Sequence, residues 1–324
     1  MTGTVTRVGL IGAGYWGTKL CEEYLLMEKT DPNFKLSYVA DGSRVALDTL
    51  GQKLQVGRKI TLTSDYKEII DDKEVKGVHV AIPNRFHFEV AKKALEKGKN
   101  VLVEKPMALT SREAFKLLSL AREGGLVLQV GHIFRFNNSL IEMRNTLPKF
   151  GRLRYMRLSW ATTFAASADR DIVFDLGPHP VDVLNFLLGE WPDVINATAS
   201  LDSTGDSRAS AVFVNLRFPD GPIATVYLSW VHYGQKVRAL EVISDKARID
   251  CDLLAQKVHV DYADGRSENL AVKPNNTIHD MEAHFVARIR ARGPEFNDAF
   301  TGAMTVSVLE SVAKSTQTGA MRAS

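Results

Sequence analysis

The segment DLGPHPVD places three groups that could exchange protons close together: Asp175, His179 and Asp182. Pro180 suits the first position of a helix, which predicts His179 as the helix cap. The positive end of a helix disfavours an imidazolium, so we expect His179 to stay neutral and able to accept a proton. Asp175 could then orient its ring, and Asp182 falls on the same face. A cluster of capping and turn residues is the alternative interpretation.

A charged pair ends an apolar run in VEKPMA, where Glu104 and Lys105 precede Pro106. Ligands of a doubly wound sheet bind beyond the carboxyl ends of its strands, where a charged side chain meets the cofactor. A partly desolvated lysine beside a nicotinamide is suited to acid–base work. A solvated lysine at a strand end is the alternative.

A glycine-rich turn in GLIGAGYWG supplies Gly12, Gly14 and Gly17 as G-x-G-x-x-G. The motif follows a predicted strand and opens a predicted helix, the context in which glycines let a pyrophosphate approach the backbone. The spacing therefore predicts a dinucleotide site.

The cofactor choice depends on Asp41, which ends the next predicted strand. A carboxylate there accepts hydrogen bonds from ribose hydroxyls and repels a 2′-phosphate, which favours NAD. Ser43 and Arg44 lie close enough to hold a 2′-phosphate, so NADP is the alternative.

Other polar and aromatic residues follow the same strands. Tyr15, Trp16, Pro83, Asn84, His87 and Glu104 are further candidates for cofactor binding, although Asn84 could simply start a helix. In GHIFRFN, Arg135 could bind an anionic substrate group, and the candidates for substrate binding are His132, Arg135, Asn137 and Asp182. Lys236 and Arg238 are interpreted as charges on a sheet surface. The remaining histidines show no metal-ligand spacing, and no role is assigned to His79, His259, His279 or His284.

Alternating apolar runs and helical patterns in the first part of the chain must position most of these residues. Strands are predicted at RVGLIG, KLSYVA, GVHVAIP, NVLVEKP and LVLQVGH, with helices over 15–27, 43–54, 86–98 and 111–125, the last capped by Ser111. Strands this rich in Val, Ile and Leu are typical of a buried parallel sheet. Residues 1–128 therefore predict an α/β domain with a doubly wound parallel sheet.

The pattern changes near residue 130. After a helix over 139–147 and the helix that contains Val181, strands are predicted at RLRYMRLSWATT, DVINATASL, ASAVFVNLRF, IATVYLSWVHY, VRALEVISD and KVHVDYA, with FPDGP as a hairpin turn. Two helices, over 280–292 and 298–315, close the chain. Residues 129–324 thus predict an α+β domain with an antiparallel sheet and helices on one face.

The composition narrows the classes of function. The chain of 324 residues is 45% hydrophobic and 24% charged, with a net charge of +3 and no basic run of the kind that binds nucleic acid. The two cysteines, Cys21 and Cys251, form no metal motif. Nothing resembles a signal peptide or a membrane span, so we expect a cytoplasmic protein without a membrane partner.

Five segments together resemble the Gfo/Idh/MocA oxidoreductase family over almost the whole chain: GAGYWG, AIPNRFHFEVAKKAL, VEKPMA, VGHIFRFN and DLGPHPVDVLNFLLG. The resemblance implies a Rossmann domain, then a mostly antiparallel sheet whose exposed face mediates homodimers or homotetramers. It implies that Lys105 and the Asp175/His179 pair meet substrate beside the nicotinamide, with a cis peptide before Pro106.

Within the family, the chain resembles the nucleotide-sugar branch, known for 3-dehydrogenation of UDP-N-acetylglucosaminuronate. GYWG, HIFRFN, DLGPH and SWVHYGQKVR carry this resemblance, although the branch tends to have a proline before the lysine of the last segment. We therefore expect an NAD-dependent dehydrogenase that oxidises a secondary hydroxyl of a sugar. His179 would take the proton, and Asp175 would set the histidine tautomer. Lys105 would bind the developing alkoxide and could share or relay the proton, so either His179 or Lys105 could be the principal base. An NADP-dependent sugar or polyol oxidoreductase, a redox-neutral glycosidase that uses NAD, and a non-catalytic dinucleotide sensor are the alternatives.

Overall fold

The computed structural model describes residues 5–55, 60–163, 171–201, 209–291 and 296–318. Contacts between Cα atoms divide the chain into two compact units. Unit 1 comprises residues 1–133 and 277–306, and unit 2 comprises residues 134–276 and 307–324. The domain boundary predicted after residue 128 stays a prediction.

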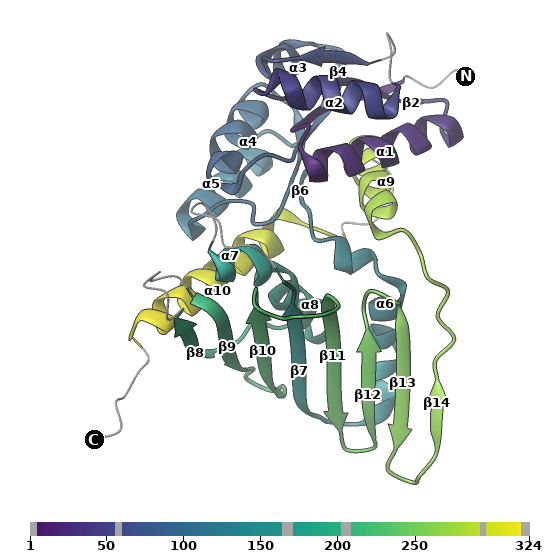
Figure 1. Cartoon of the computed structure of the whole chain (residues 1–324), viewed down its shortest axis with the longest axis vertical. Helices are drawn as coiled ribbons and strands as arrows, with labels where there is room; N and C mark the ends of the chain where they lie inside the picture. The colour runs from purple at the N-terminus through teal and green to yellow at the C-terminus, as the bar shows by residue number, and fades with distance from the viewer. Residues whose placement is uncertain (1–4, 56–59, 164–170, 202–208, 292–295, 319–324) are drawn as a thin grey trace. The chain divides into compact units, whose positions relative to one another are not determined.

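Unit 1 is built on a parallel sheet with the strand order β3-β2-β1-β4-β5-β6. Its strands are β1 (Thr6–Ile11), β2 (Phe34–Ala40), β3 (Thr61–Thr63), β4 (Val75–Val80), β5 (Asn100–Val103) and β6 (Leu128–Val130) (Figure 1). This is the order of doubly wound dinucleotide-binding sheets, as predicted. The sequence analysis missed β3, because this edge strand is short and its pattern is more polar than that of the central strands.

Helices pack against this sheet. They are α1 (Tyr15–Thr30), α2 (Arg44–Leu54), α3 (Lys67–Asp71), α4 (His87–Glu96), α5 (Ser111–Glu123), α9 (Thr277–Ile289) and the first part of α10 (Ala299–Thr318), with the short 3-10 helices η1 (Asn84–Phe86) and η2 (Ile133–Phe136). Contacts join α1 to α9 and α4 to α5. Thr110, and not Ser111, caps α5, because its side chain accepts a hydrogen bond from the Glu113 N–H at 3.2 Å. The predicted end of α9 at residue 292 lies outside the described residues.

Unit 2 contains an eight-stranded sheet with the order β14-β13-β12-β11-β7-β10-β9-β8. The strands are β7 (Leu153–Ala161), β8 (Val194–Leu201), β9 (Ala209–Arg217), β10 (Ile223–Ser229), β11 (Val237–Ser244), β12 (Ala247–Asp252), β13 (Lys257–Tyr262) and β14 (Ser267–Asn269). Neighbouring strands are antiparallel except β7 and β10. The mostly antiparallel sheet and the FPDGP hairpin between β9 and β10 are confirmed, whereas β12 and β14 were not predicted.

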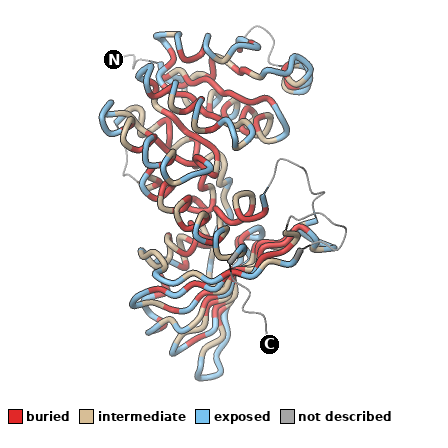
Figure 2. Tube along the Cα trace, turned by 90° about the vertical axis from the view of Figure 1, so that its left-hand side faces the viewer, coloured by how far each residue is buried: buried red, intermediate tan, exposed pale blue. Residues whose placement is uncertain are grey.

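The two sheets bury their side chains differently (Figure 2). Central strands of unit 1 are buried along nearly their whole length, as β4 shows. In unit 2, buried and partly exposed positions alternate along β10 and β11, because only one face of the sheet is covered. The helices of unit 2 are α6 (Asn138–Thr146), η3 (Leu147–Phe150), α7 (Ile172–Leu176) and α8 (Pro178–Leu188), with the end of α10. Within the described ranges, no helix is both long and apolar enough to span a bilayer.

Candidate functional site

The glycine loop after β1 has a geometry that only glycine permits. Gly12 has φ +118°, and a Cβ at this position would lie 2.1 Å from the Ala81 carbonyl oxygen. A Cβ on Gly17 would lie 2.0 Å from the carbonyl oxygen of Gly12, whereas one on Gly14 would meet no atom within 4 Å. Helix α1 then begins at Tyr15 without a capping side chain or an acidic residue in its first turn. The loop and the positive helix end therefore fit a pyrophosphate.

Asp41 is fixed beside this loop at the end of β2. Its Oδ2 accepts a hydrogen bond from the Ala13 N–H and its Oδ1 from the Ser43 N–H, each at 2.8 Å. The Ser43 hydroxyl caps α2, and Arg44 pairs with Asp48 at 3.2 Å on the surface. The Asp41 carboxylate is thus held in place by two backbone N–H donors. Ser43 and Arg44, the two residues suited to a 2′-phosphate, already interact with residues of α2.

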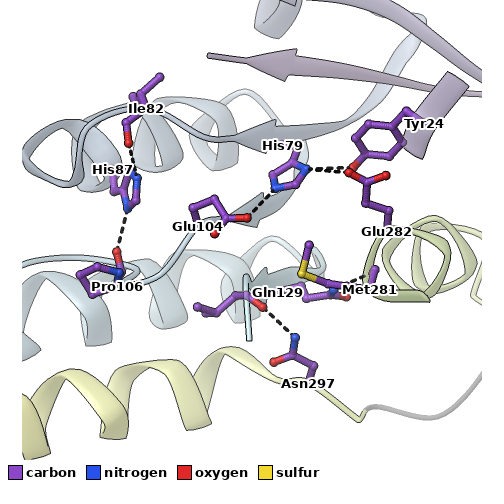
Figure 3. Close-up of polar contacts among 11 residues, drawn as sticks. Tyr24, His79, Ile82, His87, Glu104, Pro106, Gln129, Met281, Glu282 and Asn297 are labelled. Atoms are coloured by element: carbon purple, nitrogen blue, oxygen red, sulfur yellow. Dashed lines mark hydrogen bonds and ion pairs between the residues drawn. The ribbon is translucent and has the colours of Figure 1, made fainter. Parts of the chain in front are cut away.

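The segment after β5 contains the cis peptide between Lys105 and Pro106 that the family resemblance implied. A buried histidine, His87, connects this segment to the one after β4 (Figure 3). Its Nδ1 lies 2.7 Å from the Pro106 carbonyl oxygen and its Nε2 lies 2.8 Å from that of Ile82. Burial lowers the pKa of His87, which favours a neutral ring that donates to one of the two carbonyls. His87 thus holds the two segments together, and its contact with a cofactor stays a prediction.

Glu104 is buried behind Lys105. A Cβ on Gly131 would lie 2.6 Å from Glu104 Oε2, so the carboxylate needs a glycine at the end of β6. Its Oε1 lies 3.4 Å from His79 Nε2. Burial opposes ionisation, but the hydrogen bond from His79 and the positive charge near the carboxyl, that of Lys105 included, outweigh it and leave the pKa of Glu104 below its ordinary value. Glu104 is therefore a carboxylate with a protein partner, which favours a positioning role over direct cofactor contact.

A second buried acid lies on the other side of the His79 ring (Figure 3). His79 Nδ1 lies 3.1 Å from the Tyr24 hydroxyl and 3.8 Å from Glu282 Oε1 of α9. Among the described residues, neither carboxyl oxygen of Glu282 has a hydrogen-bond partner. Burial, with the charges of Glu23 and Glu104, raises the pKa of Glu282 well above its ordinary value. Burial therefore favours the neutral form of Glu282 in the interior of unit 1.

The remaining cofactor candidates follow β1 and β4 in unit 1. Tyr15 is largely exposed, with the Lys19 ammonium 4.6 Å from its ring centroid, and Trp16 is half-buried. Pro83 is exposed and Asn84 begins η1, which is the helix-starting role left open above. Since β1 and β4 are adjacent parallel strands, these residues share the carboxyl edge of the sheet with the glycine loop. Their contact with a cofactor stays a prediction.

In unit 2, the D-x-G-x-H segment spans two short helices. Asp175 lies in α7, and α8 begins at Pro178 with Gly177 at its cap position. The prediction that His179 caps the helix was therefore wrong: Pro178 suits the first helical position as well as Pro180 does, and the helix begins there. The half-buried His179 ring packs edge-on against Phe134, with 5.1 Å between their centroids.

Arg238 faces the interior of unit 2, which corrects its interpretation as a charge on the sheet surface. It is 6% exposed, lies 5.2 Å from the Trp160 ring centroid and donates a hydrogen bond to the Ala161 carbonyl oxygen. Burial lowers the pKa of Arg238 to about 10, although the charge of Asp175 opposes this shift. Asp175 therefore interacts electrostatically with a buried cation of the same unit, whether or not a ligand is bound.

The residues predicted to bind substrate are buried with protein partners. Arg135 donates from Nε to Asp182 Oδ1 at 2.7 Å and from its terminal nitrogen to Asn185 Oδ1 at 2.8 Å. Asn137 caps α6 and donates to the Leu253 carbonyl oxygen at 2.9 Å. His132, in unit 1, is 1% exposed. Asp182 thus neutralises Arg135. Because Arg135 is the only arginine or lysine among the predicted substrate-binding residues, this set offers no unpaired guanidinium or ammonium to an anionic substrate.

Family models match both parts of the chain. The model described as an oxidoreductase family with an NAD-binding Rossmann fold matches residues 6–132. The model of the GFO/IDH/MocA C-terminal domain matches residues 141–250. The chain belongs to the Gfo/Idh/MocA oxidoreductase family.

The Gfo/Idh/MocA proteins that are similar to this chain include enzymes with different named activities. An uncharacterised oxidoreductase of Streptococcus pneumoniae is 27% identical over 70% of this chain, and the match spans 62% of that protein. UDP-N-acetylglucosamine 3-dehydrogenase of Acidithiobacillus ferrooxidans is 26% identical over 71% of this chain and 75% of its own length. Its solved structure covers 98% of this chain and 99% of its own, with a TM-score of 0.85 at 23% identity. A levoglucosan dehydrogenase complex with NADH and levoglucosan covers 98% of both chains, with a TM-score of 0.83 at 18% identity. At these identities, the structural likeness concerns the fold alone.

The sequence analysis missed the buried polar cluster of this Gfo/Idh/MocA protein. His79 received no role because it has no metal-ligand spacing, and within the described residues no group of three or more His, Cys, Asp or Glu could hold a metal ion. A signal was available, since a histidine interrupts the otherwise apolar GVHVAIP strand. Buried polar groups need partners, and those of His79 come from distant segments that hold Tyr24, Glu104 and Glu282.

We expect Glu282→Gln to change how stability depends on pH. The pKa of Glu282 is raised in the folded state, so the folded protein keeps a proton that the unfolded chain loses near its ordinary, lower pKa. Wild-type stability therefore falls with rising pH in this window, by up to about 1.4 kcal/mol per pH unit for one proton. The glutamine variant lacks this fall. Denaturant unfolding from pH 5 to 8 measures it, with Glu89→Gln as an exposed control. Parallel curves for wild type and Glu282→Gln would contradict a neutral Glu282.

We expect Asp182→Asn to destabilise the protein by about 3–5 kcal/mol, because it leaves the buried Arg135 without its counter-ion. The side chains of this pair are 8% and 1% exposed. Asp193→Asn breaks the exposed ion pair with Arg217 and should have little effect. Chemical denaturation measures both variants, and equal stabilities would show that the Arg135 pair contributes no more than a surface pair.

Proposed function

We propose that this protein is an NAD-dependent dehydrogenase that oxidises a secondary hydroxyl of a nucleotide sugar. The observation that carries the proposal is the glycine loop. Gly12 has a conformation that only glycine adopts, and helix α1 begins after the loop, at Tyr15, without a capping side chain. Asp41 is fixed beside the loop by two backbone donors. This combination fits a dinucleotide.

NAD fits these residues better than NADP. Asp41 would accept hydrogen bonds from the ribose hydroxyls, and its negative charge opposes a 2′-phosphate. The competing candidates are engaged, because Ser43 caps α2 and Arg44 pairs with Asp48. The glycine loop would hold the pyrophosphate. When bound, NAD supplies the hydride acceptor.

The proposal divides the acid–base work between two motifs. His179 takes the proton of the substrate hydroxyl, and Lys105 donates a hydrogen bond to the oxygen as its negative charge develops. Asp175 holds His179 in the tautomer that accepts a proton. Arg135 and Asp182 support the start of α8 through their buried ion pair and do not bind substrate.

The nucleotide-sugar substrate is supported by similarity in sequence. A relative that is 26% identical over most of this chain is named UDP-N-acetylglucosamine 3-dehydrogenase. The levoglucosan dehydrogenase with the same fold has a sugar as its ligand, which supports the wider class of carbohydrate substrates. The cytoplasmic location expected from the sequence belongs to the same proposal.

We also propose that the protein is a homodimer or homotetramer that uses the uncovered face of the sheet in unit 2. Phe213 and Tyr227 stack on neighbouring strands with 4.9 Å between their centroids, and Phe213 is 50% exposed. Ile223 is 55% exposed on β10. Apolar groups exposed in this way are typical of an interface. Light scattering measures the mass in solution, and a monomer at micromolar concentration would refute the proposal.

The first experiment mixes the purified protein with NAD or NADP and a panel of UDP-sugars, UDP-sugar acids, free sugars and polyols. The absorbance of reduced nicotinamide reports hydride transfer. We expect a rise with NAD and one class of UDP-sugar, and a slower or absent rise with NADP.

Each other outcome favours a different function. A rise with free sugars or polyols alone would replace the nucleotide sugar by a simple carbohydrate. A faster rise with NADP would refute the role of Asp41. NAD binding, measured by calorimetry, without any rise would refute the dehydrogenase.

A further inference from the structure

A histidine lies between two carboxyl groups inside unit 1 (Figure 3), and one of these groups belongs to Glu104, the residue before Lys105. His79 is fully buried in β4. Glu104 lies 3.4 Å from one ring nitrogen, and Tyr24 and Glu282 lie 3.1 Å and 3.8 Å from the other. An apolar side chain would fill this position in a parallel strand without the desolvation that these groups require. The cluster therefore needs a reason other than packing.

The contacts determine where the protons are. A carboxylate only accepts hydrogen bonds, so the contact with Glu104 requires a proton on His79 Nε2. On a neutral ring, Nδ1 then accepts the hydroxyl proton of Tyr24. The imidazole of β4 thus accepts a hydrogen bond at Nδ1 from Tyr24 of α1 and donates one from Nε2 to Glu104, which follows β5. Its donor faces Glu104, the residue immediately before Lys105.

We propose that His79 is a positioning residue of the proposed dehydrogenase, whose Nε2–H keeps Glu104 as a carboxylate beside Lys105. This inference rests on the proposed function only in assigning acid–base work to Lys105. The charge of Glu104 does not depend on the proposed function, because the groups that surround it all lie in unit 1. Glu104 and Lys105 carry opposite charges, and the carboxylate stabilises the ammonium that donates the hydrogen bond to the alkoxide.

Glu282 completes the arrangement by staying neutral. Glu23 and Cys21 of α1 face it in addition to His79, Tyr24 and Glu104, and none of these groups donates a hydrogen bond to either of its oxygens. Glu23 in turn lies 3.6 Å from His279 Nδ1 of α9. A second carboxylate on the Nδ1 side of the ring would compete with Glu104 for the N–H proton of His79. A neutral Glu282 leaves Glu104 as the acceptor.

Four variants test the proposal. His79→Leu removes the donor, and His79→Gln keeps an amide that can donate to Glu104 and accept from Tyr24. Glu104→Gln removes the charge directly, and Glu282→Gln replaces the neutral acid by a neutral amide. His259→Gln, at an exposed histidine, is the matched control for the chemical change.

The first readout needs no substrate. Infrared spectroscopy at neutral pH detects the carbonyl band of protonated carboxyl groups. We expect Glu282→Gln to lose intensity and His79→Leu to gain it, and the double variant with Glu104→Gln to lose this gain. His79→Gln and His259→Gln should match wild type. A His79→Leu spectrum identical to that of wild type would overturn the proposal.

The second readout is the pH profile of turnover with the substrate that the panel identifies. We expect His79→Leu and Glu104→Gln to move the alkaline limb to lower pH by about 1 unit, because an ammonium without its anion loses its proton more easily and then no longer donates to the alkoxide. KM for NAD should not change, and His79→Gln should restore the wild-type limb. A lower rate at an unchanged limb in both variants would mean a purely structural role and would overturn the proposal.

The two readouts separate the possible failures. If no panel substrate reacts, the proposed function fails, while the infrared spectra still decide whether His79 sets the charge of Glu104. If His79→Leu does not fold, Glu104→Gln and His79→Gln decide the proposal. A shifted limb in Glu104→Gln together with a wild-type limb in His79→Gln would support it, and identical pH profiles of the two variants would overturn it.

Discussion

Replacing Lys105 by methionine is expected to lower kcat by about 10²–10⁴-fold, the usual contribution of a group that handles a proton in the transition state. Methionine keeps much of the length of the side chain and removes its charge and hydrogen bonds. The glycine loop and Asp41 are not altered, so calorimetry should find NAD affinity unchanged. Stopped-flow measurement of reduced nicotinamide in a single turnover gives the chemical rate.

Two further variants make the result specific. Lys97→Met removes an exposed ammonium of the same unit that pairs with Asp71, and it should turn over like wild type. Lys105→Arg keeps a positive charge but cannot give up its proton. A large loss in Lys105→Arg would assign a proton-transfer role to Lys105, whereas a small loss would assign it to electrostatic stabilisation of the alkoxide. Normal turnover in Lys105→Met would remove Lys105 from the mechanism.

His179→Ala is expected to have a loss of the same order, about 10²–10⁴-fold in kcat, because the hydroxyl would lose its general base. The His179 ring contacts Phe134 and Trp160, so its removal also leaves space beside these aromatic side chains. His179→Asn keeps a polar group of similar size, and circular dichroism will show whether both variants fold. A changed pH profile in the residual activity identifies a lost base.

The combination of both substitutions tests whether Lys105 and His179 act in one step. If they act on the same hydroxyl, the double variant should be little slower than the slower single variant, because residues that work as a unit are not additive. If each acts independently, the two losses should multiply. Multiplying losses would contradict the shared role proposed for the two motifs, even if each single variant were slow.

The local sequence predicted the backbone of unit 1 because its signals are short-range. Apolar runs marked the central strands, and the spacing of Gly12 and Gly17 anticipated a loop in which their Cβ atoms would overlap carbonyl oxygens. The edge strand β3 gave no comparable signal, since an edge position does not require an apolar run. In unit 2, β12 alternates buried and more exposed positions like its neighbours, and the sequence analysis did not identify it as a strand.

The candidate site was predicted less completely, because the role of a charged residue depends on its distant neighbours. Arg135 was expected to be a free cation, yet it pairs with Asp182, far along the sequence. Arg238 was expected on the surface, yet its side chain lies over Trp160. Alternation along a strand gives two faces, and spacing alone does not tell which face another element covers.

By itself, the sequence determined the family, the two kinds of sheet and the three motifs that contain Gly12, Lys105 and His179, because these features depend on the local backbone and on the order of segments. Only the tertiary structure decided which ionisable groups meet. His79 carries no visible role in the sequence, and folding places it between Glu104 and Glu282. Burial and proximity fix the charge of each acid, and both arise only when segments distant in the chain pack together.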